Sequence, residues 1–276
     1  MNNKILVLQI EDRTDNLLNK LLNENKEICK ANEMEYVFMN NTSSIISAYW
    51  RKVFEINNIM KKEEYDSIDY IMWLDSDAFL FEFTKEKLNN LLKKNKDYSM
   101  LITPDMPEYY SKFCAGVFMI KNNKEGKKII DKWISLYNPN DWKYDSEKKK
   151  WSTDKEWAGV AYEQGSFTEY ILTDENFKKD ISILPYYVFN NNSCVDYKPD
   201  TISTHLTGHL KADKKITDKC EETLKYKLYQ KENFESHYNN NKIIIIILII
   251  LILLLILIFF LKKKVFLKSF MGKKYF

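Results

Sequence analysis

A run of nineteen consecutive apolar residues near the C-terminus constrains this chain more than any other feature. Residues 243–261 read IIIIILIILILLLILIFFL and contain no polar side chain. A helix of this length, at about 1.5 Å per residue, spans roughly 28 Å, close to the thickness of the hydrocarbon core of a bilayer. Backbone groups inside lipid must hydrogen-bond to one another, so the run should be helical despite its β-branched residues. A buried core helix, the alternative, rarely extends so far without a polar residue, and the run therefore predicts one transmembrane helix.

The predicted membrane helix divides the chain into four parts. Residues 1–220 are expected to form a globular head, 221–242 a stem, 243–261 the membrane helix and 262–276 a basic tail. The N-terminus has too few apolar residues for a signal peptide, which favours insertion after synthesis and a cytosolic head. Six lysines follow the span and one precedes it, which by the positive-inside tendency favours a luminal head. We expect a single-pass membrane protein with a cytosolic head, and the luminal orientation remains the alternative.

Charge is unevenly distributed between the head and the anchor. The whole chain carries a formal net charge of +3, but seven lysines and no acids lie from Lys242 onward, which leaves residues 1–241 with −4. Binding of nucleic acid needs clustered positive charge, and the head has only two arginines, Arg13 and Arg51. Nucleic acid is therefore not expected as a partner. The four cysteines have no CxxC spacing and predict neither a zinc ribbon nor a disulfide scaffold.

Strands and helices alternate along most of the head. Hydrophobic runs predict strands over residues 4–10, 34–39, 69–74, 98–103 and 115–120. Helical spacing of apolar residues predicts helices over residues 15–30, 43–62, 85–94, 124–137 and 161–172. Short strands are expected near 181–189 and 201–205, and a polar loop over 138–157. This order predicts an α/β fold with a mostly parallel sheet.

Two aspartates follow the third predicted strand in the segment WLDSDA, residues 73–78. Asp75 and Asp77 would emerge at the carboxyl end of a buried strand, where open α/β sheets bind their ligands. Two carboxylates so close together repel each other unless a cation lies between them, and hard oxygen ligands suit Mg²⁺ or Mn²⁺. A solvated Asp-Ser-Asp turn is the alternative for the segment alone. Its position after an apolar strand favours a metal site.

A second polar segment, HLTGHLK at residues 205–211, follows the last predicted strand. His205 can complete a carboxylate metal site, and mixed nitrogen and oxygen ligands favour Mn²⁺ over Mg²⁺. Lys211 can then meet a phosphate. Two ordinary surface histidines are the alternative for this segment.

Two glycine-containing segments also adjoin predicted strand or helix ends. They are FCAGVF at 113–118 and EQG at 163–165, and a glycine there permits close approach of the backbone to a ligand. Packing or a simple turn is the alternative for each. The sequence contains no GxGxxG and no GxxxxGK[ST], which argues against a dinucleotide dehydrogenase and a P-loop NTPase.

The order of these motifs resembles that of the retaining GT-A glycosyltransferases. WLDSDA, PD before FCAGVFMIKN, EQGSFTEYI and HLTGHLK follow one another as do the motifs of glycosyltransferase family 8, the glycogenin-like group. The stretches AYWRKV and WLDSDA are also similar to the family 34 galactosyl- and xylosyltransferases. The resemblance covers roughly residues 4–215. It implies a GT-A fold, which is Rossmann-like with helices on both faces of the sheet.

The resemblance assigns metal and nucleotide roles to five residues. Asp75 would hold the ribose and the metal, Asp77 the metal, and His205 would be the third protein ligand. Lys211 would contact the diphosphate, and Lys52 would approach the nucleotide phosphates. The family motif continues with Pro-Trp after the lysine, where this chain has Ala-Asp.

The resemblance places four further residues near the sugar. Ala115 and Gly116 would lie along the donor sugar, and Glu163 and Gln164 would face the sugar and the acceptor. Two departures from the family pattern concern this region. Cys114 stands where the family has Asn, and Glu163 stands where the family has Asp, which moves the carboxylate outward by one methylene.

These residues together predict a metal-dependent, hexosyltransferase-like enzyme. It would move a hexose or pentose from a nucleotide-diphosphate sugar, in particular a UDP-sugar, to a hydroxyl of a glycan, protein or lipid acceptor. A non-catalytic, membrane-tethered module that binds nucleotide sugar is the alternative. The loop at 138–157 also carries Trp142, Trp151 and Trp157, whose rings either stack on an acceptor sugar or pack internally.

Overall fold

The computed structural model of the chain describes residues 3–13, 16–40, 43–80, 83–107, 111–194, 197–208, 214–215, 218–220 and 222. The predicted membrane helix at 243–261, the basic tail, nearly all of the predicted stem and Lys211 lie outside these residues. Within the described ranges, no helix has both the length and the apolar character needed to cross a membrane.

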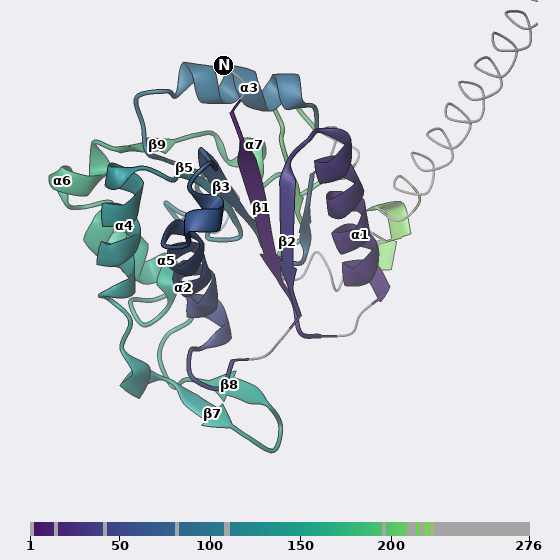
Figure 1. Cartoon of the computed structure of the whole chain (residues 1–276). Helices are drawn as coiled ribbons and strands as arrows, with labels where there is room; N and C mark the ends of the chain where they lie inside the picture. The colour runs from purple at the N-terminus through teal and green to yellow at the C-terminus, as the bar shows by residue number, and fades with distance from the viewer. Residues whose placement is uncertain are drawn as a thin grey trace, which may run out of the picture. The chain divides into compact units, whose positions relative to one another are not determined.

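A six-stranded sheet forms the centre of the described fold (Figure 1), with the strand order β2-β1-β3-β6-β5-β9. Its strands are β1 (Ile5–Ile10), β2 (Glu35–Met39), β3 (Tyr70–Leu74), β5 (Met100–Ile102), β6 (Val117–Lys121) and β9 (Ile181–Ile183). β6 pairs antiparallel with both of its neighbours, and the other strand pairs are parallel. The expected α/β fold with a mostly parallel sheet is confirmed.

Helices cover both faces of the sheet. They include α1 (Asn16–Ala31), α2 (Ala48–Met60), α3 (Lys85–Lys94) and α4 (Lys124–Ile134). Successive residues of a strand point to opposite faces, so Leu6 and Leu8 of β1 join one apolar cluster and Ile5 and Val7 the other. The first cluster contains residues of α2 and α4, and the second contains residues of α1 and α3. Burial on both faces explains why β1 and β3 are nearly continuous apolar runs.

Two predicted elements have different bounds because of local hydrogen bonds or a proline. The helix expected from residue 43 begins at Ala48, because the Ser43 hydroxyl accepts bonds from the amides of residues 45 and 46 in a local turn. The strand expected over 181–189 ends at Ile183. Pro185 follows at the N-cap of the short helix α7 (Tyr186–Phe189), so the second half of this expectation is wrong.

The region between α4 and β9 is more structured than a polar loop. A hairpin of β7 (Lys143–Asp145) and β8 (Lys150–Ser152) lies within residues 138–157, and the Asp145 carboxylate accepts bonds from two amides of its turn. The helix expected over 161–172 forms as α5 (Glu163–Ser166), followed by the π-helical segment η4 (Phe167–Ile171). Further short helices are η1 (Glu63–Tyr65), η3 (Pro139–Asp141) and α6 (Glu175–Lys178).

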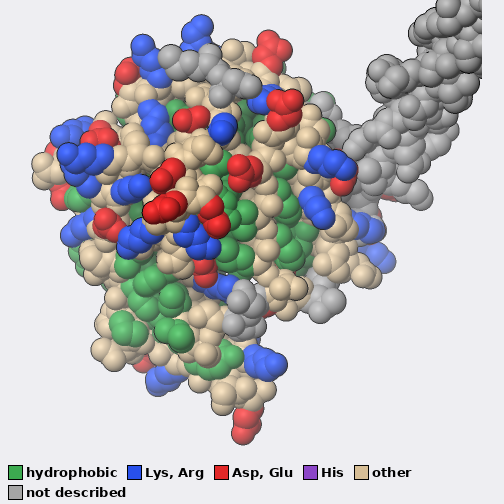
Figure 2. All heavy atoms as spheres, viewed as in Figure 1, with side chains coloured by type: hydrophobic (Ala, Val, Ile, Leu, Met, Phe, Trp, Pro, Cys, Tyr) green, Lys and Arg blue, Asp and Glu red, His purple; other side chains and the backbone are tan. Residues whose placement is uncertain are grey.

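Charged side chains of both signs cover the described surface in the view of Figure 2. Lys and Arg are interspersed with Asp and Glu over this face, and apolar side chains emerge between them. The distribution agrees with the small net charge of the head.

Candidate active site

The two aspartates of WLDSDA lie in the turn that follows β3 at the carboxyl edge of the sheet. The amide of Ala78 donates to the carbonyl of Asp75 at 2.9 Å, which closes the turn. Two buried amide side chains hold its backbone, since Gln9 donates to the carbonyl of Asp75 at 3.1 Å and Asn25 to the carbonyl of Ala78 at 3.0 Å. The turn therefore presents Asp75 and Asp77 at the edge where open α/β sheets bind ligands.

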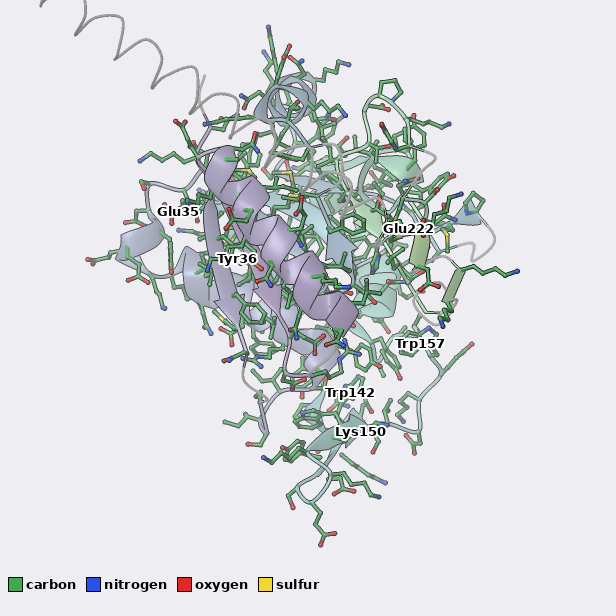
Figure 3. All side chains as sticks on the ribbon, turned by 90° about the vertical axis from the view of Figure 1, so that its right-hand side faces the viewer. Glu35, Tyr36, Trp142, Lys150, Trp157 and Glu222 are labelled. Atoms are coloured by element: carbon green, nitrogen blue, oxygen red, sulfur yellow. A yellow bond between two sulfur atoms is a disulfide. The ribbon has the colours of Figure 1, made fainter. Side chains whose placement is uncertain are left out.

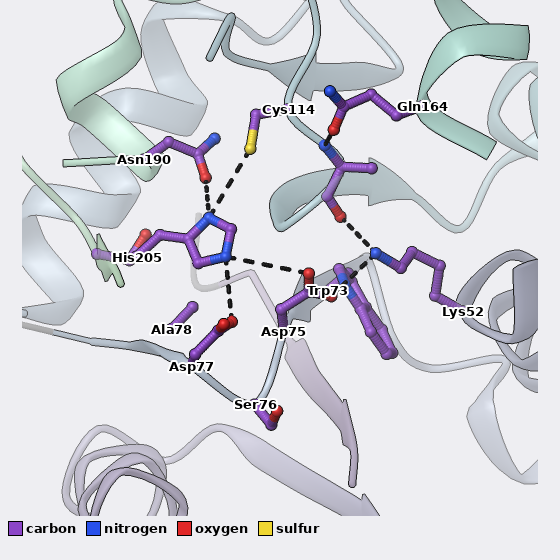
Figure 4. Close-up of polar contacts among 12 residues, drawn as sticks. Lys52, Trp73, Asp75, Ser76, Asp77, Ala78, Cys114, Gln164, Asn190 and His205 are labelled. Carbon is purple, nitrogen blue, oxygen red and sulfur yellow. Dashed lines mark hydrogen bonds and ion pairs between the residues drawn. The ribbon is translucent and has the colours of Figure 1, made fainter. Parts of the chain in front are cut away.

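A small second sheet brings His205 to these aspartates. β4 (Ala78–Phe79) pairs antiparallel with β10 (Thr204–His205), and His205 lies opposite Ala78. The imidazole Nε2 is 3.1 Å from Asp77 Oδ1 and 4.0 Å from Asp75 Oδ2 (Figure 4). One ligand atom from each of the three residues lies within 4.8 Å of the other two. Two carboxylates and one imidazole are suitable ligands for a divalent cation.

The other nitrogen of His205 contacts Asn190, which the sequence did not single out, and Cys114. Nδ1 lies 2.8 Å from Asn190 Oδ1 and 3.7 Å from Cys114 Sγ. A proton on Nδ1 donated to Asn190 leaves the lone pair of Nε2 facing the aspartates, the usual arrangement behind a metal-binding histidine. Burial alone would lower the pKa of His205, but the Asp77 carboxylate outweighs it and raises that pKa.

Gly116 leaves the space that the His205 ring occupies. A Cβ atom at residue 116 would lie 1.9 Å from His205 Cε1, far inside any ordinary contact. The carbonyl of Gly116 also accepts a hydrogen bond from the amide of Asp75 at 2.7 Å. The FCAG segment therefore contacts both Asp75 and His205. Cys114 is buried beside the imidazole, and burial raises the pKa of its thiol.

Lys52 of α2 is buried between two carboxylates. Its Nζ lies 2.9 Å from Asp75 Oδ1, 3.2 Å from Glu163 Oε1 and 3.0 Å from the carbonyl oxygen of Ala115. Burial alone would lower the pKa of Lys52, but Asp75 and Glu163 outweigh it and raise that pKa. The three ammonium protons therefore have three acceptors in the protein. The predicted approach of Lys52 to nucleotide phosphates stays a prediction.

The EQG segment begins α5 and is joined to the FCAG segment. Gln164 Oε1 accepts the amide of Ala115 at 3.0 Å, while its amide nitrogen lies 3.3 Å from Ser111 Oγ. Glu163 is buried, its Oε2 has no hydrogen-bond partner among the described residues, and burial raises its pKa. The structure thus places Gln164 against the backbone of Ala115, while Lys52 links Glu163 to the carbonyl of the same residue.

Arg13 is a further charged residue beside the aspartates, at the end of β1. Its guanidinium pairs with the Glu11 carboxylate at 2.6 Å and donates to Ser76 Oγ at 3.3 Å. Sequence reasoning counted this arginine but gave it no role. Its position shortly after β1, at the carboxyl end of a parallel strand, is the sequence signal from which a place at this edge could have been predicted.

A disulfide joins Cys194 to Cys220 near the histidine segment. The cysteine spacing had predicted no disulfide scaffold, and this single cross-link closes the part of the chain that contains His205 and Lys211. Lys211 itself lies outside the described residues, and its predicted contact with a diphosphate stays a prediction.

An open, mostly parallel sheet that presents two aspartates and a histidine at its carboxyl edge has the arrangement of a GT-A glycosyltransferase. Residues 2–112 match the galactosyl transferase GMA12/MNN10 family, which is glycosyltransferase family 34. The similarity to family 34 is thus direct over this part of the chain, and together with the fold it supports a glycosyltransferase. No curated protein sequence is significantly similar to the chain.

Three solved glycosyltransferases are similar to the chain at low sequence identity. A glycosyltransferase involved in the glycosylation of the major capsid of PBCV-1 has a TM-score of 0.59 and 17% identity, covering 79% of this chain and 99% of its own. GlyE of Streptococcus pneumoniae TIGR4 has a TM-score of 0.48 and 14% identity, covering 81% and 60%. A Drosophila galactosyltransferase 7 mutant in complex with manganese, UDP-Gal and xylobiose has a TM-score of 0.37 and 12% identity, covering 76% and 74%. Only the first of these likenesses supports the fold.

Proposed function

We propose that the chain is a metal-dependent glycosyltransferase that moves a hexose or pentose from a UDP-sugar to an acceptor hydroxyl. The convergence of Asp75, Asp77 and His205 from two distant segments carries this proposal. Aspartate oxygens and an imidazole nitrogen favour Mn²⁺, with Mg²⁺ as the alternative. When bound, such a cation would neutralise charge that develops on the departing diphosphate.

The residues of the chain have distinct tasks in this proposal. Asn190 orients the imidazole, and Lys52 holds the Asp75 carboxylate in place while compensating its charge. Gln164 fixes the backbone of Ala115, along which the donor sugar would lie. These contacts preorganise the site before the substrate arrives, so little reorganisation remains for the reaction.

Glu163 bears on the stereochemical course. A double displacement with retention needs a carboxylate that can reach the anomeric carbon. The Glu163 side chain is only 5% exposed and Oε1 is paired with Lys52, which favours a front-side reaction in which the leaving phosphate takes the acceptor proton. Retention itself rests on the family resemblance.

A donor screen tests the proposed function. The full-length chain in detergent is heated with UDP-Glc, UDP-Gal or UDP-Xyl, with and without Mn²⁺, and its melting temperature is recorded. We expect one donor to raise the melting temperature only when Mn²⁺ is present, and to release UDP. The variant with both Asp75→Ala and Asp77→Ala should lose both effects, and an unchanged response of this variant would refute the proposal.

A non-catalytic module that binds nucleotide sugar remains the second candidate. Cys114 in place of asparagine and Glu163 in place of aspartate favour it, because both residues lie where the family contacts the sugar. It is distinguished by donor binding without release of UDP or transfer to any acceptor.

For the membrane topology, we propose a single-pass protein anchored by residues 243–261. The Cys194–Cys220 disulfide supports the luminal alternative for the head, because disulfides persist mainly in oxidising compartments. Protease protection of the head in sealed microsomes distinguishes the two orientations.

A further inference from the structure

Four aromatic side chains form a cluster beside the EQG segment. Tyr49 contacts Trp142, Trp157 and Tyr162 with ring centroids 5.6, 5.4 and 5.0 Å apart, and Tyr162 also contacts Trp142 at 5.0 Å and Trp157 at 4.9 Å. Figure 3 shows Trp142 and Trp157 at the end of the molecule that carries the hairpin residue Lys150. Trp142 is buried, whereas Trp157 is 68% exposed.

The exposed indole of Trp157 is held in a defined position. Tyr49 and Tyr162 meet it edge-on, at interplanar angles of 76° and 66°. The loop behind it is fixed as well, since Trp50 Nε1 donates to the carbonyl of Ala161 at 2.8 Å. Gly165 packs directly on this loop, where an added Cβ would lie 2.1 Å from the carbonyl oxygen of Gly159. An exposed indole that is packed edge-on against two tyrosines keeps a face available for stacking on a ligand.

The cluster adjoins the residues expected to face the acceptor. Tyr162 immediately precedes Glu163, and Tyr49 lies one helical turn before Lys52 on α2, so the two share a face of the helix. The phenol of Tyr49 lies within electrostatic reach of both Glu163 and Lys52. A ligand stacked on Trp157 therefore lies next to the candidate site, on the side of the EQG segment.

The chemistry of the cluster favours a neutral sugar ring. The C–H groups on one face of a pyranose carry partial positive charge and meet the negative face of an aromatic ring, while its hydroxyls need polar partners at the rim. The phenol of the exposed Tyr49 can supply such a partner. The indole N–H of Trp142 has no acceptor among the described residues, although this side chain is more than nine-tenths buried.

The charged residues that flank Trp157 carry no excess of positive charge. Lys155 pairs with Asp141 at 3.7 Å, and Glu156, the residue before Trp157, is exposed. Such a surface favours a neutral ligand over an anionic lipid headgroup. We propose that Tyr49, Trp142, Trp157 and Tyr162 form an acceptor subsite, which binds a neutral sugar ring of a glycan on the exposed indole of Trp157. This inference rests on the proposed function, which it extends by naming the acceptor class.

Saccharide binding tests the subsite. The full-length chain is kept in a detergent without a sugar headgroup, and saturation-transfer NMR measures its binding of cellobiose, lactose, xylobiose and mannobiose with UDP and Mn²⁺ present. We expect at least one of these disaccharides to bind. Trp157→Ala should weaken that binding about tenfold, whereas Trp157→Phe, which keeps a ring, should weaken it about threefold or less.

Tyr98→Ala is the matched control, because Tyr98 is an exposed aromatic residue outside the cluster. It should leave disaccharide binding unchanged, and all three variants should bind UDP with Mn²⁺ as the unmodified chain does. If UDP binds and no disaccharide does, or if Trp157→Ala binds disaccharide normally, the subsite is refuted. If UDP fails to bind while Trp157→Ala still abolishes disaccharide binding, the proposed function fails and the sugar-binding surface stands.

Discussion

Gly116→Ala is expected to damage the candidate metal site, although it replaces none of the three candidate ligands. The new methyl group would lie 1.9 Å from His205 Cε1, 2.4 Å from Nδ1 and 2.7 Å from Nε2. An ordinary contact of a Cβ atom is 3.4 Å or longer, so the ring or the backbone must move by about 1.5 Å. The ring has little freedom to do so, because Asp77 at 3.1 Å and Asn190 at 2.8 Å hold its two nitrogens.

The size of the effect follows from these contacts. A displaced imidazole loses the bond between Nδ1 and Asn190, and loss of such an orienting partner typically lowers metal affinity 10- to 100-fold. Forcing one extra methyl group into a packed site also lowers the free energy of unfolding by about 1–3 kcal/mol. We expect both effects together, because the same clash causes them.

Calorimetric titration of the full-length chain with Mn²⁺, in the presence of UDP, measures the first effect, and chemical denaturation without metal measures the second. Gly159→Ala is the matched control, since the nearest atoms to its added methyl group all belong to Glu156 and lie 3.1 Å or more away. That variant should keep its Mn²⁺ affinity and unfold at nearly the same denaturant concentration.

A double-variant cycle with His205→Ala separates this reasoning from a general loss of stability. Without the imidazole the methyl group has room, so adding Gly116→Ala to His205→Ala should cost little further Mn²⁺ affinity or stability. If the losses of the two single variants simply added in the double variant, the methyl group would be acting on residues other than His205. Normal Mn²⁺ affinity of the Gly116→Ala variant would refute the packing argument outright.

Two further predictions concern the buried ion pairs and the cross-link. Lys52→Met should lower the free energy of unfolding by about 3–5 kcal/mol in denaturation experiments, because it leaves the buried Glu163 carboxylate without a cation. Adding Glu163→Gln should recover part of the loss, and no recovery would contradict the pairing. Reducing Cys194–Cys220, which are 26 positions apart, should cost about 3.5 kcal/mol and lower the melting temperature. The variant with serine at both positions should melt low with or without reductant, and a reductant effect that persists in it would contradict this assignment.

The sequence was sufficient to locate the carboxylates of the site. Asp75 and Asp77 follow a strand whose unbroken apolar character marks a buried element of a parallel sheet, and such a strand ends at the ligand edge. The helix over residues 85–94 was predicted with its observed bounds, because Thr84 caps it and Leu88 and Leu92 give it an apolar face. Local patterns of this kind need no knowledge of the tertiary fold.

Contacts between distant segments could not be predicted in the same way. Cys114 and His205 are 91 positions apart, and the contact of Asn190 with the imidazole arises from how α7 and β10 pack. In the sequence Asn190 is one of three consecutive asparagines, and nothing there indicates which of them contacts the histidine. The family resemblance assigned Lys52 to the nucleotide phosphates, and nothing in the sequence indicates its burial between two carboxylates.

The pairing of the cations decides how the site can bind an anion. Lys52 is fully engaged by Asp75, Glu163 and the Ala115 carbonyl, and Arg13 is paired with Glu11. Among the described residues, these two cations next to the aspartates are therefore already compensated within the protein. A diphosphate that approached Asp75 and Asp77 alone would meet repulsion, which only a bound divalent cation can reverse. For this reason the comparison with and without Mn²⁺ is the decisive part of the donor screen, since binding that is equally strong in both would require a source of positive charge other than the Asp–Asp–His group.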